Sequence, residues 1–205
     1  MFSLLIFMAL KQIDLIMVEI FDKHEASVGY FSAASQSAQI LIITYTSLNL
    51  LFSPFISEAM QEGAAKLKNI LWQMARITSL FCLPMLLILI VFGKEILGLF
   101  GGDYVVAYPA LVTLALGLSI NAILGSHITF LQFSNKPFTV VIVQCFTLAI
   151  NLTLNAILIP LYSITGAGIA SATALIVMTL WIRYLSWRKL QEMQAKDALA
   201  NEVKQ

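Results

Sequence analysis

Six apolar segments alternate with short polar gaps along the chain. About 20 apolar residues in a helix cross a hydrocarbon core roughly 30 Å thick, and strands of a membrane barrel would be shorter and strictly alternating. Each segment must satisfy its own backbone hydrogen bonds in lipid, so the pattern predicts an all-α, polytopic membrane protein with six transmembrane helices. The predicted spans are Phe2–Ile20, Ala33–Ile56, Ile77–Phe92, Leu111–Phe133, Phe138–Leu158 and Ile169–Leu185.

The longest charge-free stretch gives the clearest pair of spans. No Lys, Arg, Asp or Glu occurs from Pro137 to Ile182, and the stretch is interrupted once, between Pro160 and Gly166. This length exceeds one membrane crossing, so the pattern predicts two helices and a tight turn. Pro54 and Pro160 are expected at span ends, whereas Pro84 is expected to kink the third span.

Composition narrows the class of protein. The chain is 60% hydrophobic and 11% charged, whereas a soluble domain carries roughly 25% charged residues. Its net charge of +1 argues against a nucleic-acid partner. No gap between spans is long enough to fold as a catalytic domain, so we expect a non-enzyme without catalytic residues or cofactor. Cys82 and Cys145 lie in apolar spans without metal-ligand spacing, so no metal site is expected.

The basic residues are divided unequally between the two sides that six spans define. Cytoplasmic loops carry an excess of Lys and Arg, so the richer side is expected in the cytoplasm, with both termini. We expect a six-helix transmembrane domain over residues 1–187 and a polar cytoplasmic tail over 188–205. The poorer side holds only Lys23 and Lys94, and the richer side holds Lys66, Lys68, Arg76, Lys136, Arg183, Arg188, Lys189, Lys196 and Lys204.

Two ionisable residues lie near the middle of the first span, whereas Glu19 is close to its outer end. Lys11 and Asp14 are three residues apart and therefore share one helical face. They could face a water-filled cavity, as intramembrane ionisable groups usually do. Alternatively they form a mutually neutralising pair against a neighbouring helix, or the span begins later.

The fifth span carries amide side chains along one stripe. Gln144, Leu148, Asn151 and Asn155 follow a spacing of four, three and four residues. Amides both donate and accept hydrogen bonds, so they suit sugar hydroxyls. The stripe could be the wall of a hydrophilic path or a set of interhelical hydrogen bonds, and we keep both interpretations.

Small residues mark the fourth and sixth spans. Gly117, Asn121 and Gly125 lie on one face, which favours close helix packing as well as substrate contact by Asn121. Gly166, Gly168 and Ala170 predict a packing surface in the last span. His127 stands alone near the end of its span and could be a hydrogen-bonded structural histidine or a proton site.

Several sequence words resemble a known membrane family. The chain resembles the C-terminal half of a Wzx-type polysaccharide or oligosaccharide flippase, in the multidrug/oligosaccharidyl-lipid/polysaccharide exporter superfamily. The usual Tyr-Gly after the proline is Tyr162-Ser163 here. The matching words are 14–21 (DLIMVEIF), 28–34 (VGYFSAA), 52–58 (FSPFISE), 96–104 (ILGLFGGDY) and, most specifically, 151–170 (NLTLNAILIPLYSITGAGIA).

The resemblance implies a fold and an activity. Such proteins place two six-helix halves around a central cavity and move lipid-linked sugar repeat units across the bacterial cytoplasmic membrane by alternating access. The implied partners are the bilayer, a lipid-linked sugar, and an N-terminal six-helix half or a second copy of this chain. A cation-coupled multidrug exporter half and an inactive truncated fragment are the alternatives. Lys11, Asp14, Asn121, Gln144, Asn151 and Asn155 are the candidates for the substrate path.

Overall fold

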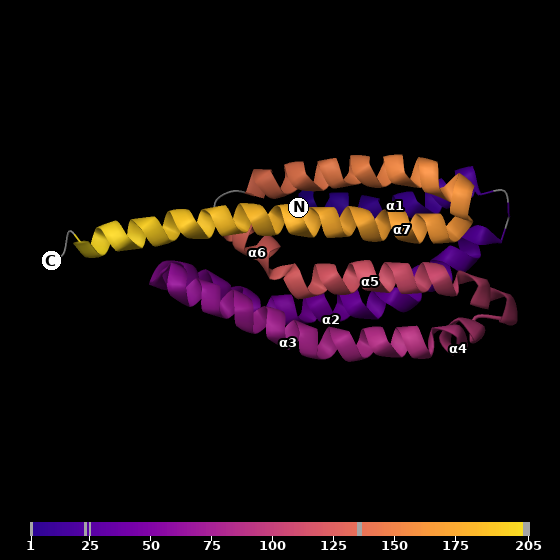
Figure 1. The fold of residues 1–205 in the computed structure, drawn as a ribbon, viewed down its shortest axis with the longest axis horizontal. Helices are drawn as coiled ribbons and strands as arrows, with labels where there is room; N and C mark the ends of the chain where they lie inside the picture. The colour runs from indigo at the N-terminus through magenta and orange to yellow at the C-terminus, as the bar shows by residue number, and fades with distance from the viewer. Residues whose placement is uncertain (1, 23, 25, 135–136, 203–205) are drawn as a thin grey trace.

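The computed structural model describes residues 2–22, 24, 26–134 and 137–202, and it describes the backbone alone for residues 2–11, 137, 196 and 198–202. The described residues form helices and contain no strand, which confirms the all-α prediction. The long helices lie side by side along one axis (Figure 1). The elements are α1 (Phe2–Phe21), α2 (Ser27–Glu62), α3 (Ala64–Val91), α4 (Gly93–Gly98), the 3-10 helix η1 (Gly102–Ala107), α5 (Tyr108–Leu124), α6 (Ser126–Phe133) and α7 (Pro137–Glu202).

Helix α7 reverses direction at Ser163. This residue has φ 52° and ψ −139°, and it divides α7 into a first leg (137–162) and a second leg (164–202) that run side by side (Figure 1). A positive φ favours glycine, because a side chain is strained there. Ser163 therefore occupies the position where the resemblance leads one to expect glycine. Its hydroxyl donates a hydrogen bond to the Asp22 carboxylate at the end of α1.

The bundle core lies between α1, α2, α3, α5 and the two legs of α7. The largest cluster of buried apolar side chains includes Val18, Phe31, Leu111 and Ile159. Two smaller clusters of buried apolar side chains lie toward the end of the bundle where α3 begins. One surrounds Leu67 and Phe130, and the other surrounds Met178. The outer faces keep large apolar side chains exposed, among them Leu50 at 78%. An outward apolar face is the arrangement that a bilayer requires.

Four helical stretches among the described residues are long and apolar enough to cross a membrane. They are Ser27–Glu62, Ala64–Val91, Gly102–Leu124 and Phe138–Ala195. The last contains both legs of α7, where the sequence predicts two spans. The predicted span Phe2–Ile20 lies in α1, and the side chains of residues 2–11 are outside the described part of the chain. A membrane protein with several helical spans follows, and the number six stays a prediction.

Several helix boundaries differ from those of the predicted spans. The predicted span Leu111–Phe133 is divided at Gly125 into α5 and α6, and the Tyr45 hydroxyl donates a 3.0 Å hydrogen bond to the Gly125 carbonyl. Pro54 lies inside α2 because this helix continues to Glu62. Between α2 and α3 only Gly63 is non-helical, with φ 122°. The Asp197 carboxylate then accepts a 2.9 Å hydrogen bond from the Ala64 amide, so the end of α7 caps the start of α3.

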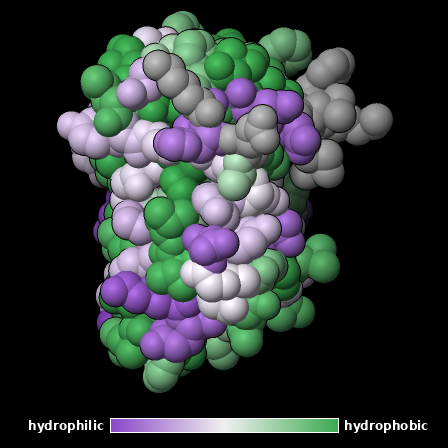
Figure 2. Space-filling model, turned by 90° about the vertical axis from the view of Figure 1, so that its right-hand side faces the viewer, coloured by the Kyte–Doolittle hydropathy of each residue, from purple (hydrophilic) through white to green (hydrophobic). Residues whose placement is uncertain are grey.

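The end of the bundle that holds the Ser163 turn has a mixed surface. Hydrophilic and hydrophobic groups lie beside each other on this face (Figure 2). Here α4 and η1 connect α3 to α5, and the Tyr108 hydroxyl donates a 2.7 Å hydrogen bond to the Ile90 carbonyl. Tyr30 and Tyr104 form an edge-to-face pair with ring centroids 5.1 Å apart. Tyrosines of this kind suit a membrane–water interface.

Candidate functional site

The Asp14 carboxylate is the centre of a buried hydrogen-bond network. Asp14 belongs to α1 and is 8% exposed. Its Oδ1 accepts hydrogen bonds from Asn155 Nδ2 at 2.8 Å and from Asn151 Nδ2 at 3.1 Å. Its Oδ2 accepts one from the Ser171 hydroxyl. Three donors from the two legs of α7 therefore converge on one carboxylate, which an ionised carboxylate, an acceptor only, can satisfy.

The donors are also linked to each other. Asn151 and Asn155 are one turn apart on the first leg, and Asn155 Nδ2 lies 3.1 Å from Asn151 Oδ1. Asn151 Nδ2 also donates to Ser171 Oγ at 3.2 Å, which connects the two legs. Among the described residues, Asn155 Oδ1 has no hydrogen-bond partner although it is buried. The site thus holds carboxylate, hydroxyl and amide oxygens close together, a set that could hold a proton or a small hard cation.

A small cavity lies beside this network. It has a volume of about 60 Å³ and is lined by Asp14, Asn151, Ser171, Thr147 and Ser35, together with apolar side chains. We call it the Asp14 cavity. Polar side chains from three helices thus surround a space of roughly the size that one or two water molecules need.

A second cavity follows along the first leg of α7. It has a volume of about 220 Å³, and Gln144, Asn121, Asn49 and Thr129 are among its lining residues. We call it the amide cavity. Ile42 and Leu118 line both this cavity and the Asp14 cavity, so these two side chains lie between them.

One polar group that lines the amide cavity can accept a hydrogen bond that no described residue donates. Gln144 is 4% exposed, and its Oε1 has no hydrogen-bond partner among the described residues. The other amides are engaged: Asn121 donates to Thr179 Oγ1 at 2.9 Å, and Asn49 accepts from Thr129 at 2.8 Å. A buried amide oxygen without a partner is costly, so a hydroxyl or water that donates to Gln144 would be bound favourably.

The predicted amide stripe therefore has two different surroundings. Asn151 and Asn155 make interhelical hydrogen bonds to Asp14, whereas Gln144 borders a cavity. Thr147 lies between them on the same face and is 2% exposed. The interpretation as interhelical hydrogen bonds thus fits Asn151 and Asn155. The interpretation as the wall of a path fits Gln144, which lies at a different depth of the first leg.

Two of the predicted ionisable residues lie apart from this network or outside the described part of the chain. The side chain of Lys11 is outside the described residues, so its predicted pairing with Asp14 stays a prediction. His127 lies on α6, and its Nδ1 is 2.8 Å from Ser186 Oγ. It faces a third cavity with Arg183 and Lys68, not the Asp14 cavity.

The glycines lie where helices approach closely. A Cβ atom on Gly117 would come 2.6 Å from the Ala172 Cα, and one on Gly168 would come 2.4 Å from Thr113 Oγ1. Both contacts join α5 to the second leg of α7. A Cβ on Gly166 would come 2.2 Å from the Leu158 carbonyl oxygen, across the hairpin, and one on Gly125 would come 2.7 Å from the Tyr45 hydroxyl. Ala170, in the same ridge, is fully buried.

Sequence reasoning missed Ser171 as a member of the network. The residue lies three positions after Gly168 and three before Ala174, within the ridge interpreted as packing. A hydroxyl on an otherwise apolar, small-residue face was the available signal. Lys68 and Arg183 were also missed, because they counted only as markers of membrane orientation.

Comparison with known proteins identifies the family. Residues 1–109, more than half of the chain, match the family described as polysaccharide biosynthesis proteins. The chain is also 26% identical over 168 residues to the probable low-salt glycan biosynthesis flippase Agl15 of Haloferax volcanii. That alignment covers 79% of this chain and 35% of Agl15, so the chain spans about a third of the length of this relative. The resemblance to polysaccharide flippases is confirmed at this level, and the chain belongs to the polysaccharide biosynthesis protein family of multi-pass membrane proteins.

Proposed function

We propose that this chain is one half of a membrane transporter that flips lipid-linked oligosaccharide or polysaccharide repeat units. The observation that carries the proposal is the interior polar track. It runs from the Asp14 network to the amide cavity inside a helical bundle whose family acts in polysaccharide biosynthesis. The similarity to a protein named as a glycan biosynthesis flippase supports the same conclusion.

The amide cavity supplies the sugar contacts in this proposal. Gln144 and Asn121 present neutral groups that can donate and accept, which suits hydroxyl groups without attracting free ions. At about 220 Å³ the cavity in this half alone accommodates only part of a repeat unit. The remaining contacts would come from the second half, across the shared path.

The Asp14 network is the proposed coupling site. A buried carboxylate that exchanges a proton or a small cation changes its charge, and this changes which helix arrangement is more stable. Its three donors come from the two legs of α7, so loss of the negative charge would weaken the contact between α1 and the α7 hairpin. During alternating access, α1 and the α7 hairpin would move relative to each other at this contact.

A second half is part of the proposal. The most apolar 18-residue stretch of α2 has only 11% of its residues buried within this chain, and that of α3 only 22%. These faces require lipid or another helical unit. We propose an N-terminal six-helix half or a second copy of this chain, in the cytoplasmic membrane with both termini in the cytoplasm.

Complementation tests the function directly. A strain that lacks its polysaccharide flippase should recover surface glycan when this chain is expressed with a matching N-terminal half. Recovery should fail for Gln144→Leu at equal membrane abundance, whereas Thr153→Val, which alters an exposed position on the same leg, should restore export. Export that is unaffected by Gln144→Leu would remove the amide cavity from the path.

The same system separates a flippase from a cation-coupled drug exporter. The Asp14 network is compatible with ion coupling in either case, so the substrate must decide. Vesicles containing the paired halves should move a fluorescent lipid-linked sugar and not a cationic dye. Dye efflux without glycolipid movement would assign the alternative function.

A further inference from the structure

The largest of the cavities described here lies away from the proposed sugar path and is basic. It has a volume of about 450 Å³ and lies between the start of α3 and the second leg of α7, with His127 of α6 at its border. Lys68 and Arg183 line it, as do Trp72, Trp187 and Ser186. Among the described residues that line it none is acidic. We call it the basic cavity.

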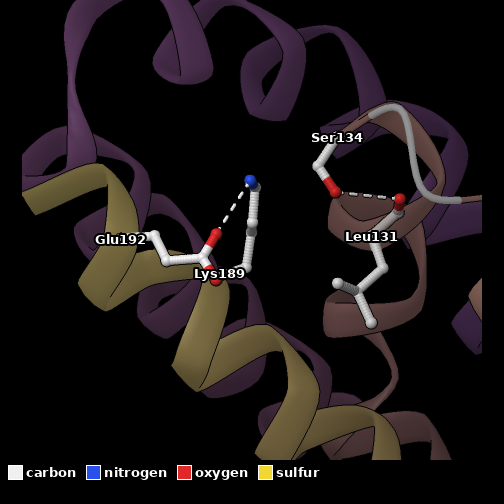
Figure 3. A network of polar contacts seen from close by, with 4 residues as sticks. All are labelled: Leu131, Ser134, Lys189 and Glu192. Atoms are coloured by element: carbon white, nitrogen blue, oxygen red, sulfur yellow. Dashed lines mark hydrogen bonds and ion pairs between the residues drawn. The ribbon is translucent and has the colours of Figure 1, made fainter. Parts of the chain in front are cut away.

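The two permanent charges of this cavity lack partners within the described residues. Neither Lys68 nor Arg183 makes an ion pair or side-chain hydrogen bond with another described residue. Acidic groups on adjacent turns are engaged elsewhere: Glu62 pairs with Lys66, and Asp197 caps Ala64. Glu192 forms an ion pair with Lys189, with 3.1 Å between the charged atoms. This pair lies near the end of α6, where the Ser134 hydroxyl donates a hydrogen bond to the Leu131 carbonyl (Figure 3). The cavity therefore keeps a net positive potential.

The basic cavity lies at the level along the helices that corresponds to the headgroup region of a membrane. Arg183 is the first charged residue after the charge-free stretch that ends at Ile182, and Arg76 directly precedes the apolar run of α3. Trp72 and Trp187 are about half exposed, at 53% and 55%, and Arg76 stacks on the Trp72 ring. Tryptophan beside arginine is typical of the level at which lipid phosphates lie.

Apolar side chains continue from the cavity toward the membrane centre. On the second leg, Leu180 precedes Arg183 by three residues and Trp187 by seven, which places all three on one face. On α3, Leu83 follows Trp72 by eleven residues, again on the same face. Both leucines are more than half exposed. A ligand with a phosphate group and hydrocarbon chains matches this arrangement, whereas free phosphate matches only its polar end.

We propose that the basic cavity binds the phosphate headgroup of an anionic membrane lipid. Basic pockets between transmembrane helices on the cytoplasmic side are suited to such headgroups. The bound lipid would join α3, α6 and the second leg of α7, three elements that border the cavity. The site is separate from the proposed sugar path, so its occupancy can be tested without any transport assay.

Native mass spectrometry of the purified 205-residue chain tests the proposal. We expect phosphatidylglycerol to be retained in preference to phosphatidylcholine, and this preference to decrease with added NaCl because the contact is electrostatic. Lys68→Gln and Arg183→Gln should each weaken phosphatidylglycerol binding about fivefold. Arg188→Gln is the matched control, since it removes the same charge from the same leg outside this cavity and should bind as the unaltered chain does.

Three outcomes would overturn the proposal. Equal retention of the two phospholipids, with no effect of salt, would show that the cavity does not select an anionic headgroup. Competition by millimolar inorganic phosphate would indicate a free-phosphate site. Stronger retention of an unglycosylated polyprenyl diphosphate would assign the cavity to the transported lipid. The comparison of lipids and the salt series need only the unaltered chain, so the test does not depend on the folding of a variant.

Discussion

Asn155 donates a 2.8 Å hydrogen bond to the carboxylate of Asp14, a residue 141 positions earlier in the chain, and this bond joins α7 to α1. Both side chains are buried, and Asp14 has further donors in Asn151 and Ser171. A carboxyl group shared by three donors is an arrangement that depends on every member, because removal of one leaves the others less well satisfied.

A double-mutant cycle should measure this dependence. We expect Asp14→Asn and Asn155→Ala to show a coupling free energy of roughly 1–2 kcal/mol, within the range for hydrogen bonds inside membrane proteins and to charged groups. Unfolding of the purified chain in mixed micelles gives the four free energies. Thr153→Ala is the control, because among the described residues the Thr153 hydroxyl bonds only to the Ala149 carbonyl of its own helix and should not couple to Asp14. Additive effects of the first pair would contradict the network.

The contact between Gly117 and Ala172 should not tolerate a side chain. Because a Cβ on Gly117 would come 2.6 Å from a backbone atom, Gly117→Ala must separate α5 from the second leg of α7. We expect destabilisation of about 1–3 kcal/mol or more, the usual effect of overpacking. Gly98→Ala is the control, since among the described residues no atom outside the adjoining residues and the local helix backbone lies within 4 Å of the added methyl group. Equal thermal stability of the two variants in detergent would contradict the close approach.

The melting temperature of the chain should depend on whether residue 163, at the turn of the α7 hairpin, is glycine or alanine. Ser163→Gly removes the strain of a positive φ, worth on the order of 1 kcal/mol, while losing the bond to Asp22. Ser163→Ala loses the same bond and keeps the strain. We therefore expect the alanine variant to melt at a lower temperature than the glycine variant. The reverse order would show that the backbone at this turn is not strained.

Acid should weaken the contact of this turn with the end of α1. Partial burial raises the pKa of Asp22, but hydrogen bonds from Ser163 and the His24 amide outweigh it, so the pKa lies below its ordinary value of 3.8. A lowered folded-state pKa means that the stabilisation is complete above the unfolded-state pKa and is lost as pH falls through the folded-state value. The effect is small because Asp22 is largely solvated.

Thermal unfolding between about pH 5 and pH 3 checks this sign. The difference in melting temperature between the unaltered chain and Asp22→Asn should shrink as the pH falls. A difference that is constant with pH would mean that ionised Asp22 does not stabilise the turn.

The sequence was sufficient to predict the helices but not the contacts between them. Hydrophobic segments mark helices because lipid leaves the backbone no other partner, and the predicted spans with described side chains are helical except at Gly125 and at the end residue Phe92. The break at Gly125 was missed, since the Tyr45 contact that accompanies it comes from α2. The bond between Asp14 and Asn155 was also out of reach. Spacing defines which residues share a face, but which faces meet is decided by packing of small residues such as Gly117 and Gly168.

Cysteine labelling from one side tests the proposed orientation. The excess of basic residues at the end that holds Lys68 and Arg183 predicts that this end is cytoplasmic. In intact cells a membrane-impermeant maleimide should therefore react with Asp103→Cys, in η1, and not with Gln73→Cys, in α3, which should react only after permeabilisation. The native thiols give little background, because Cys82 is buried and Cys145 lies on the outer face of a predicted span. Labelling of Gln73→Cys in intact cells would invert the predicted orientation and place the basic cavity at the opposite membrane surface.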